Sequence, residues 1–413
     1  MRGFAYNLRV CICVILAVVC PMATVAQDAA ANLILLKDAA QSILTGDLEK
    51  ADTELQKVLA SDPDEYHALN FLGVIRAQQH QERDAEALFK QVIAQKPEFV
   101  GAHVNLGHLY AETKREEDAT AQFQEALRLD PTRSDALAAL VNVFRAQART
   151  AVGAGNFEKG LALLLQARKA SSHDPAVLFD FGMTALQMSL FPDAIEAFEE
   201  SLAARKDDPN TLYALGRAQI SLSKLPEAKA SFEQFALLRP NDASGHYALG
   251  LVLQSLQQLA DARRHFEKST ELQPAQTEAY FQLGLMDLEE KHLESSAQEF
   301  NRVLQRDAKH AGAQFGLGRV SFDKKDYPNA ISMLERAIAS DASLRQAHYY
   351  LGLAYARIER KDDSERELET ASKLEHEEVE QHRVVLKILN SKDAVPASDA
   401  NQSKDSQSKD NPK

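Results

Sequence analysis

The chain has 413 residues, of which 45% are hydrophobic and 26% charged, as is ordinary for a soluble folded protein. Its formal net charge is −13 and it contains no run of basic residues. This charge argues against a nucleic-acid partner, because phosphate binding requires clustered lysine and arginine. The length allows two or three compact domains or one elongated array.

The N-terminal segment resembles a secretory signal peptide. Arg2 and Arg9 precede an apolar stretch too short to span a membrane comfortably, and small residues at Thr24 and Ala26 suit signal-peptidase cleavage. We therefore predict a signal peptide over residues 1–26. In a bacterial host the remaining chain would be periplasmic, associated with the outer membrane or secreted.

All three cysteines lie in this segment, so the mature chain would have no disulfide and no thiol chemistry: Cys11, Cys13 and Cys20. Two alternatives to cleavage stay open. The segment could remain as a membrane anchor, or Cys20 could carry a lipid, although Val19 before it is bulkier than a lipidation signal normally tolerates.

The rest of the chain repeats with a period of 34 residues. Each period contains a glycine, a small residue twelve positions later and a large apolar residue four positions after that. Apolar residues recur at helical spacing on both sides of each glycine, so each period predicts two amphipathic helices joined by a turn. The glycines are Gly73, Gly107, Gly182, Gly216, Gly250, Gly284, Gly318 and Gly352.

This pattern resembles the tetratricopeptide repeat family, whose signature has Leu-Gly, a small residue, an aromatic and a proline at these offsets. The resemblance implies an all-α fold, a right-handed superhelical solenoid of about ten helix-turn-helix units over residues 27–390. The chain departs from the family in lacking tryptophan and in having Asp38-Ala39 instead of Leu-Gly in the first unit. The predicted units begin at Asn32, Tyr66, Val100, Ser134, Pro175, Pro209, Ala243, Thr277, Ala311 and Arg345.

Two segments interrupt or end this array. The fourth unit carries seven extra residues, close to two helical turns, which predicts a first helix lengthened to about residues 152–155. This insertion is either neutral drift or a protruding end that bends the array or contacts a partner. We expect residues 377–390 to form a capping helix and residues 391–413, which repeat Ser-Lys-Asp, to be a disordered polar tail.

No pattern in the sequence predicts a catalytic residue, a metal site or a cofactor. Gly316-Leu317-Gly318 begins like a nucleotide loop, but Ser321 replaces the final glycine and no strand precedes it. Three histidines share the repeat position at which the family often has tryptophan, which favours packing over metal binding: His103, His246 and His348. We therefore expect a protein that is not an enzyme.

The family resemblance implies a concave groove lined by the first helices, with the fifth residue of each unit facing it. From the fifth unit on, that position is aromatic in every repeat, and arginines follow one turn later in two units. We predict that this row binds an apolar or acidic segment of a partner protein, although aromatics here also pack between helices. The predicted groove residues are Phe179, Tyr213, Tyr247, Phe281, Phe315 and Tyr349, with Arg217 and Arg319.

Our main functional hypothesis is an exported scaffold that holds protein segments and helps to assemble or position a complex of the cell envelope. Stacked aromatics also suit sugar rings, so a glycan- or polymer-binding module in polysaccharide export or envelope assembly is the alternative. The predicted partners are protein or peptide segments, with membrane contact only through an uncleaved signal segment. An enzyme built on the extended fourth unit is the least favoured hypothesis, because no acid–base pair or nucleophile accompanies it.

Overall fold

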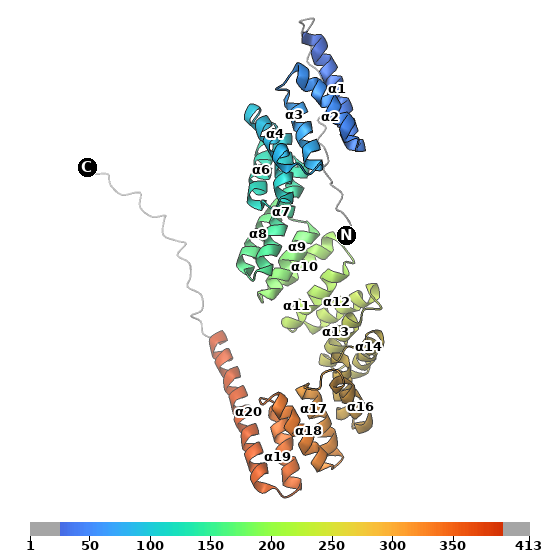
Figure 1. Ribbon diagram of the computed structural model, residues 1–413. Helices are drawn as coiled ribbons and strands as arrows, with labels where there is room; N and C mark the ends of the chain where they lie inside the picture. Colours follow the sequence, from blue (N-terminus) through green and yellow to red (C-terminus); the bar gives the residue numbers. More distant parts are fainter. Residues whose placement is uncertain (1–24, 391–413) are drawn as a thin grey trace, which may run out of the picture. The chain divides into compact units, whose positions relative to one another are not determined.

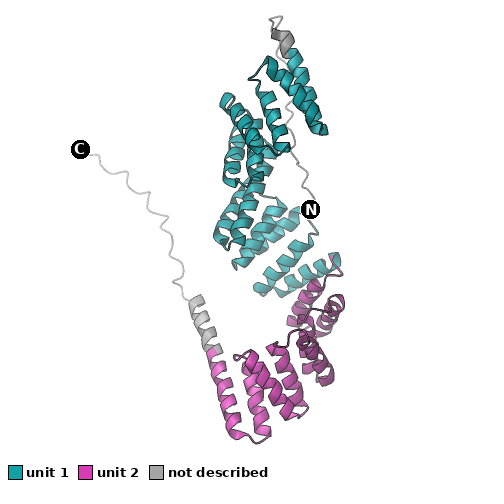
Figure 2. Ribbon diagram, in the orientation of Figure 1, with its two compact units in different colours: residues 1–238 teal, residues 239–413 magenta. Residues whose placement is uncertain are grey.

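The computed structural model describes residues 25–390, with side chains for residues 30–377, and divides the chain into two compact units (Figures 1 and 2). Unit 1 covers residues 1–238 and unit 2 covers residues 239–413. The described residues form twenty consecutive α-helices without a strand, which confirms the predicted all-α repeat fold. None of these helices is both long enough and apolar enough to cross a membrane.

Unit 1 contains the first six helix pairs, and each pair is one repeat. Its helices are α1 (Val25–Thr45), α2 (Leu48–Ser61), α3 (Tyr66–Gln78), α4 (Glu82–Gln95), α5 (Val100–Glu112), α6 (Glu116–Leu129), α7 (Ser134–Gly153), α8 (Phe157–Ala170), α9 (Pro175–Gln187), α10 (Phe191–Ala204), α11 (Pro209–Ser221) and α12 (Leu225–Leu238). Within unit 1 each helix packs on the next along the chain, as a stacked array requires.

Unit 2 contains the last four pairs. Its helices are α13 (Ala243–Ser255), α14 (Leu259–Leu272), α15 (Glu278–Glu289), α16 (Leu293–Leu304), α17 (Ala311–Asp323), α18 (Tyr327–Ser340), α19 (Arg345–Arg357) and α20 (Lys361–Asn390). In both units the large residue of the second helix is the most deeply buried side chain. It has at most 1% exposed surface in nine repeats, where it is Leu55, Phe89, Phe123, Leu164, Phe198, Phe232, Phe266, Phe300 and Leu334.

The helix starts follow from local capping chemistry. Asp174 and Asp208 each precede a proline at the first helical position, and each side chain accepts a hydrogen bond from the first turn. Asp242 caps α13 in the same way. Eight of the ten predicted unit starts are the first residues of helices, and Thr277 is the residue just before α15.

The turn inside each repeat ends the first helix with one residue in the left-handed region. Glycine takes this position in the first and fourth repeats, at Gly46 and Gly155. Polar residues take it in the other eight, with φ between 57° and 65°: His80, Lys114, Ser189, Ser223, Gln257, Lys291, Lys325 and Glu359. The next amide closes the turn by bonding back onto the helix, as Gln258 N does to Leu253 O.

Three elements differ from a plain repeat. Helix α7 has 20 residues where most first helices have 13, which confirms the lengthened helix. Helix α1 begins at Val25 rather than Asn32, because its start is rich in alanine, a strong helix former, and contains no proline. Residues 377–390 are the last part of α20 and do not form a separate helix. The handedness of the superhelix stays a prediction.

The two terminal predictions lie at or beyond the edge of the described residues. The predicted signal peptide, residues 1–26, overlaps them only at Val25 and Ala26, the first residues of α1. The predicted tail, residues 391–413, falls wholly outside them.

Candidate protein-binding faces of the first helices

The first helices form a layer of their own in each unit. In unit 1, α1, α3, α5, α7, α9 and α11 contact one another in succession, and in unit 2 the same holds for α15, α17 and α19. Contacts between successive second helices are sparser among the described residues. The first helices therefore line the inner surface of each unit, and those of their side chains that do not pack on the second helices face that surface.

In unit 1 the predicted aromatic row comprises Phe179 and Tyr213, both half-buried. The Phe179 ring centroid lies 6.0 Å from that of Phe198, in the second helix of the same repeat. Tyr213 lies 5.5 Å from Phe232 and 5.3 Å from Phe235. One side of each ring therefore packs on the core of its own repeat, and the other side remains accessible.

In unit 2 the four members of the row differ in exposure. Tyr247 and Phe281 are half-buried, and each lies 5.9 Å from the core phenylalanine of its own repeat. Phe315 is only 7% exposed, so it belongs mainly to the core. Tyr349 is 45% exposed and is the most accessible aromatic of the row. Phe315 and Tyr349 both contact Tyr350, at centroid distances of 6.0 and 5.5 Å.

The two predicted arginines also differ. Arg217 is exposed on α11 of unit 1. Arg319, on α17 of unit 2, is half-buried, with its guanidinium carbon 4.4 Å from the centre of the Tyr350 ring. The Nε atom of Arg319 is buried and has no hydrogen-bond partner within the described part of the chain. Arg319 is thus held by stacking rather than by hydrogen bonds.

The first helices of the second and third repeats of unit 1 carry several polar side chains. Asn105 donates a hydrogen bond of 3.0 Å to the Asn70 side chain, which links α5 to α3. His67 packs against Phe99, and His108 packs edge-on to Phe123 at 5.1 Å. Burial lowers the pKa of both His67 and His108, which favours neutral rings at physiological pH.

The three histidines at the tryptophan position have structural roles, as the sequence predicts. In each, Nε2 lies within hydrogen-bond distance of a carbonyl oxygen six residues earlier, and Nδ1 faces a side chain of the second helix. Those Nδ1 partners are Gln122 at 2.8 Å from His103, His265 at 3.0 Å from His246, and Glu367 at 2.7 Å from His348. Sequence reasoning missed that Gln314 makes the same contact to a carbonyl six residues earlier in the ninth repeat, donating to Ala308 O at 2.7 Å, while its amide oxygen accepts a hydrogen bond from Ser340 Oγ at 2.9 Å.

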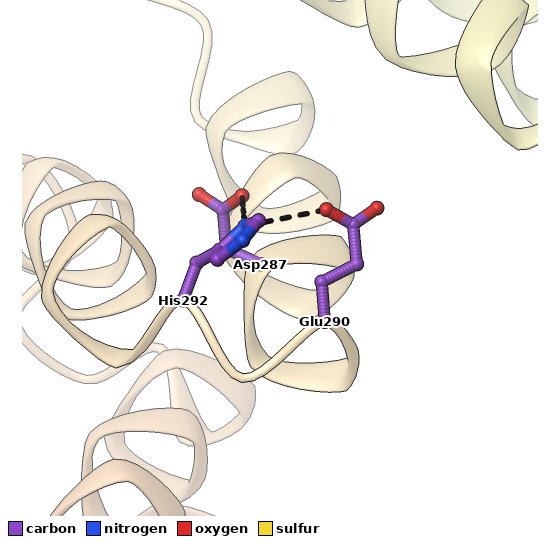
Figure 3. Close-up of side chains that lie close together, drawn as sticks. All are labelled: Asp287, Glu290 and His292. Atoms are coloured by element: carbon purple, nitrogen blue, oxygen red, sulfur yellow. Dashed lines mark ion pairs between the residues drawn. The ribbon is translucent and has the colours of Figure 1, made fainter.

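One acidic cluster escaped the sequence analysis (Figure 3). Asp287 and Glu290, at the end of α15, both face His292, whose Nδ1 lies 4.0 and 3.3 Å from their carboxylates. Arg263 already donates to both carboxylates, at 2.7 and 3.0 Å. A resident cation does not fit these residues, because the guanidinium already supplies the positive charge. The only indication of this cluster in the sequence was the i, i+3 and i+5 spacing of three residue types that can bind a metal.

The lengthened helix α7 creates a cavity of about 680 Å³ in unit 1. A 13-residue first helix would end at Ala146, and every lining residue of α7 lies beyond that point. The facing wall is the α5–α6 turn with the start of α6, where Arg115 pairs with Asp118 at 2.7 Å. The cavity is lined by Lys114, Arg115, Glu116, Glu117, Asp118, Gln147, Thr150, Ala151, Ala154, Asn156, Lys159 and Leu163.

The tetratricopeptide repeat family profile matches the chain at residues 76–143 and at five further segments, of which the last four overlap: 145–210, 213–277, 247–311, 281–344 and 315–373. The chain belongs to the tetratricopeptide repeat family. This family is in general a non-catalytic protein-interaction fold, so the chain is a repeat protein of the protein-interaction type. Comparison with curated proteins gave no match.

Several solved structures of this family are similar to the chain. YrrB, a tetratricopeptide protein with an unusual peptide-binding site, is 18% identical, with a TM-score of 0.38, over 46% of this chain and 95% of its own. The PilF protein of Pseudomonas aeruginosa is 18% identical, with a TM-score of 0.38, over 56% of this chain and 99% of its own. A chain of the Cut9–Hcn1 hetero-tetramer of the APC/C is 11% identical, with a TM-score of 0.45, over 85% of this chain and 95% of its own.

Proposed function

We propose that this tetratricopeptide protein is an exported, non-enzymatic scaffold that holds extended segments of partner proteins along the first-helix faces of its units. The observation that carries the proposal is the half-exposed aromatic row. Tyr213, Tyr247 and Phe281 each expose surface on first helices while part of the ring packs on a core phenylalanine of the same repeat. Tyr349 is 45% exposed and packs edge-on to Tyr350. Rigid aromatic side chains with little conformational freedom to lose are efficient anchors for a bound segment.

Export is proposed from the sequence of residues 1–26, with its two arginines, short apolar stretch and small residues near Ala26. Fractionation of the host, followed by N-terminal peptide mass spectrometry, tests this part by itself. A mature N-terminus at Gln27 in an envelope or secreted fraction supports export. An intact Met1 in the cytoplasm contradicts it and leaves the binding proposal untouched.

The binding part is tested by capture from host envelope extract with the C-terminally tagged full chain. The test variant replaces Tyr213, Tyr247, Phe281 and Tyr349 by leucine, which keeps apolar contact with the core and removes the rings. Phe315 is left intact because it is 7% exposed. The control variant carries Leu165→Ala and Leu237→Ala, two exposed apolar residues on second helices. Circular dichroism checks the fold of every variant.

We expect the control to capture the same proteins as wild type and the test variant to lose them. Equal capture by all three contradicts the proposed face. A polysaccharide column run in parallel separates the alternative function: retention of wild type but not of the test variant favours a glycan-binding module.

A further inference from the structure

Arg319 differs from several arginines of unit 2 that are paired with carboxylates. Arg263, Arg302 and Arg360 each donate to a carboxylate at 3.1 Å or less. The Nε–H group of Arg319 is buried and has no hydrogen-bond partner among the described residues. The side chain is 28% exposed, and its guanidinium carbon lies over the Tyr350 ring, 4.4 Å from the ring centre. The contact with the Tyr350 ring therefore helps to hold the guanidinium in place without using its hydrogen-bond donors.

The charge around Arg319 is not balanced. Its nearest carboxylate is Asp323, with Oδ2 3.8 Å from Nε, which is too far for a hydrogen bond. The same Oδ2 atom accepts a hydrogen bond from Lys291 Nζ at 2.9 Å. The neighbouring Lys324 is paired with Glu294 at 3.1 Å. Two cations thus share one carboxylate, and one positive charge is left over at Arg319.

Resting on the function proposed above, we propose that Arg319 binds an aspartate or glutamate side chain within the partner segment. A planar guanidinium with free donors suits bidentate recognition of a carboxylate. The acid belongs inside the segment rather than at its C-terminus, because the aromatic row continues on both sides of Arg319. Phe281 precedes it in α15 and Tyr349 follows it in α19. The recognised sequence is therefore an acidic residue with apolar residues on either side.

Random nine-residue peptides displayed on phage test this inference against the full chain. One library is fused through its C-terminus, so that only side-chain carboxylates are offered, and a second library ends in a free C-terminus. Selections are run with wild type, Arg319→Gln and Arg336→Gln. Arg336 is the matched control, because it is exposed on the second helix α18 and its side chain donates a hydrogen bond to the Met333 sulfur at 3.7 Å rather than to a carboxylate.

We expect wild type and Arg336→Gln to enrich acidic residues flanked by apolar ones in the first library, and Arg319→Gln to enrich the apolar residues alone. One selected peptide, labelled with fluorescein, is then compared with its Glu→Gln or Asp→Asn version by fluorescence anisotropy. Wild type should bind the neutral version about tenfold more weakly, and Arg319→Gln should bind both versions equally.

Three outcomes overturn the inference. The acid is enriched equally by Arg319→Gln, it is enriched only in the library with free C-termini, or apolar peptides are selected without any acid. In each of these outcomes the proposed peptide-binding face survives. If wild type enriches no peptide beyond what the four-leucine variant of the capture experiment enriches, the proposed function itself fails. The inference then fails with it.

Discussion

Gly250 of α13 lies directly against Phe266 of α14. A Cβ atom at Gly250 would stand 2.6 Å from Phe266 Cε1, closer than real Cβ contacts come, and Phe266 has no exposed surface. Gly73 and Phe89 stand in the same relationship, also at 2.6 Å. The missing side chain lets the two helices of a repeat meet with the ring between them, which explains why this glycine defines the period.

The first prediction is that the effect of Gly250→Ala depends on Phe266. In wild type the new methyl group must displace the buried ring, so we expect the free energy of unfolding to fall by about 1–3 kcal/mol. In a Phe266→Ala background the methyl group has room, and alanine is a better helix former than glycine. There we expect a gain of up to about 1 kcal/mol. Urea unfolding of the four proteins measures both effects, and equal losses in both backgrounds would contradict the packing described.

A second prediction concerns His348, which joins α19 to the preceding loop and to α20. Its ring lies 3.1 Å from Ala342 O and 2.7 Å from Glu367 Oε2. His348→Ala leaves this carbonyl without its partner, and we expect a loss of about 1–3 kcal/mol of unfolding free energy.

The matched variant is His348→Gln, because Gln314 makes the equivalent loop contact to Ala308 O at 2.7 Å. We expect this variant to lose less than half as much stability as the alanine variant, measured by the same urea titration. Equal losses would show that the ring packs but that its hydrogen bond to the loop is unimportant.

The sequence could specify the helix boundaries because the signals for them are local. Tyr66 and Ala243 begin helices where the 34-residue period places them, and aspartate or glutamate caps precede both. The exposure of the aromatic row is not local. Phe315 and Tyr349 occupy the same repeat position, yet one is 7% and the other 45% exposed. Packing from neighbouring helices decides this difference, and a single repeat does not encode it.

Pairings between residues far apart in the chain also could not be predicted from the sequence. Arg263 and Asp287 are 24 residues apart and belong to successive repeats, so nothing in the local pattern selects one partner from the many available charges. The same holds for the stacking of Arg319 on Tyr350. The repeat pattern predicts that Arg263 and Arg319 lie on helices. Only the packed structure shows that Arg263 is paired with Asp287 while Arg319 Nε has no hydrogen-bond partner among the described residues.

The third prediction is a late tyrosine titration. Burial, and secondly the hydrogen bond that Tyr355 donates to Glu335 at 2.7 Å, raise the pKa of Tyr355 from 10.0 to about 12. The folded state therefore favours the neutral phenol. The resulting stability is fully present below pH 10 and is lost as the pH rises through about 12.

Phenolate absorbance, recorded from pH 9 to pH 13 on wild type and Tyr355→Phe, isolates this group as a difference curve. We expect its midpoint near 12 in wild type. In Glu335→Gln the midpoint should be lower but still above the ordinary value, because burial is the larger cause. A difference curve with its midpoint at 10 would show that Tyr355 is not held as described.

The last prediction concerns the lengthened helix α7. In the fourth repeat the small residue of the second helix is Gly160, whereas the fifth repeat has the fully buried Ala194. A Cβ atom at Gly160 would stand 2.5 Å from Val152 Cγ2, in the last turn of α7. Because Val152 lies among the residues beyond a normal first helix, the extra turns themselves explain the glycine.

We expect Gly160→Ala to push Val152 away and to loosen the last two turns of α7, because those turns extend past the ordinary repeat packing. Amide hydrogen exchange followed by mass spectrometry should show faster exchange in residues 147–153, while the core peptides around Phe123 and Phe198 keep their protection. Val152→Ala added to Gly160→Ala should restore slow exchange by removing the clash. Ala194→Gly is the control and should leave residues 147–153 unchanged. Uniformly faster exchange throughout unit 1 would mean that the extended end is an integral part of the array rather than a protruding end.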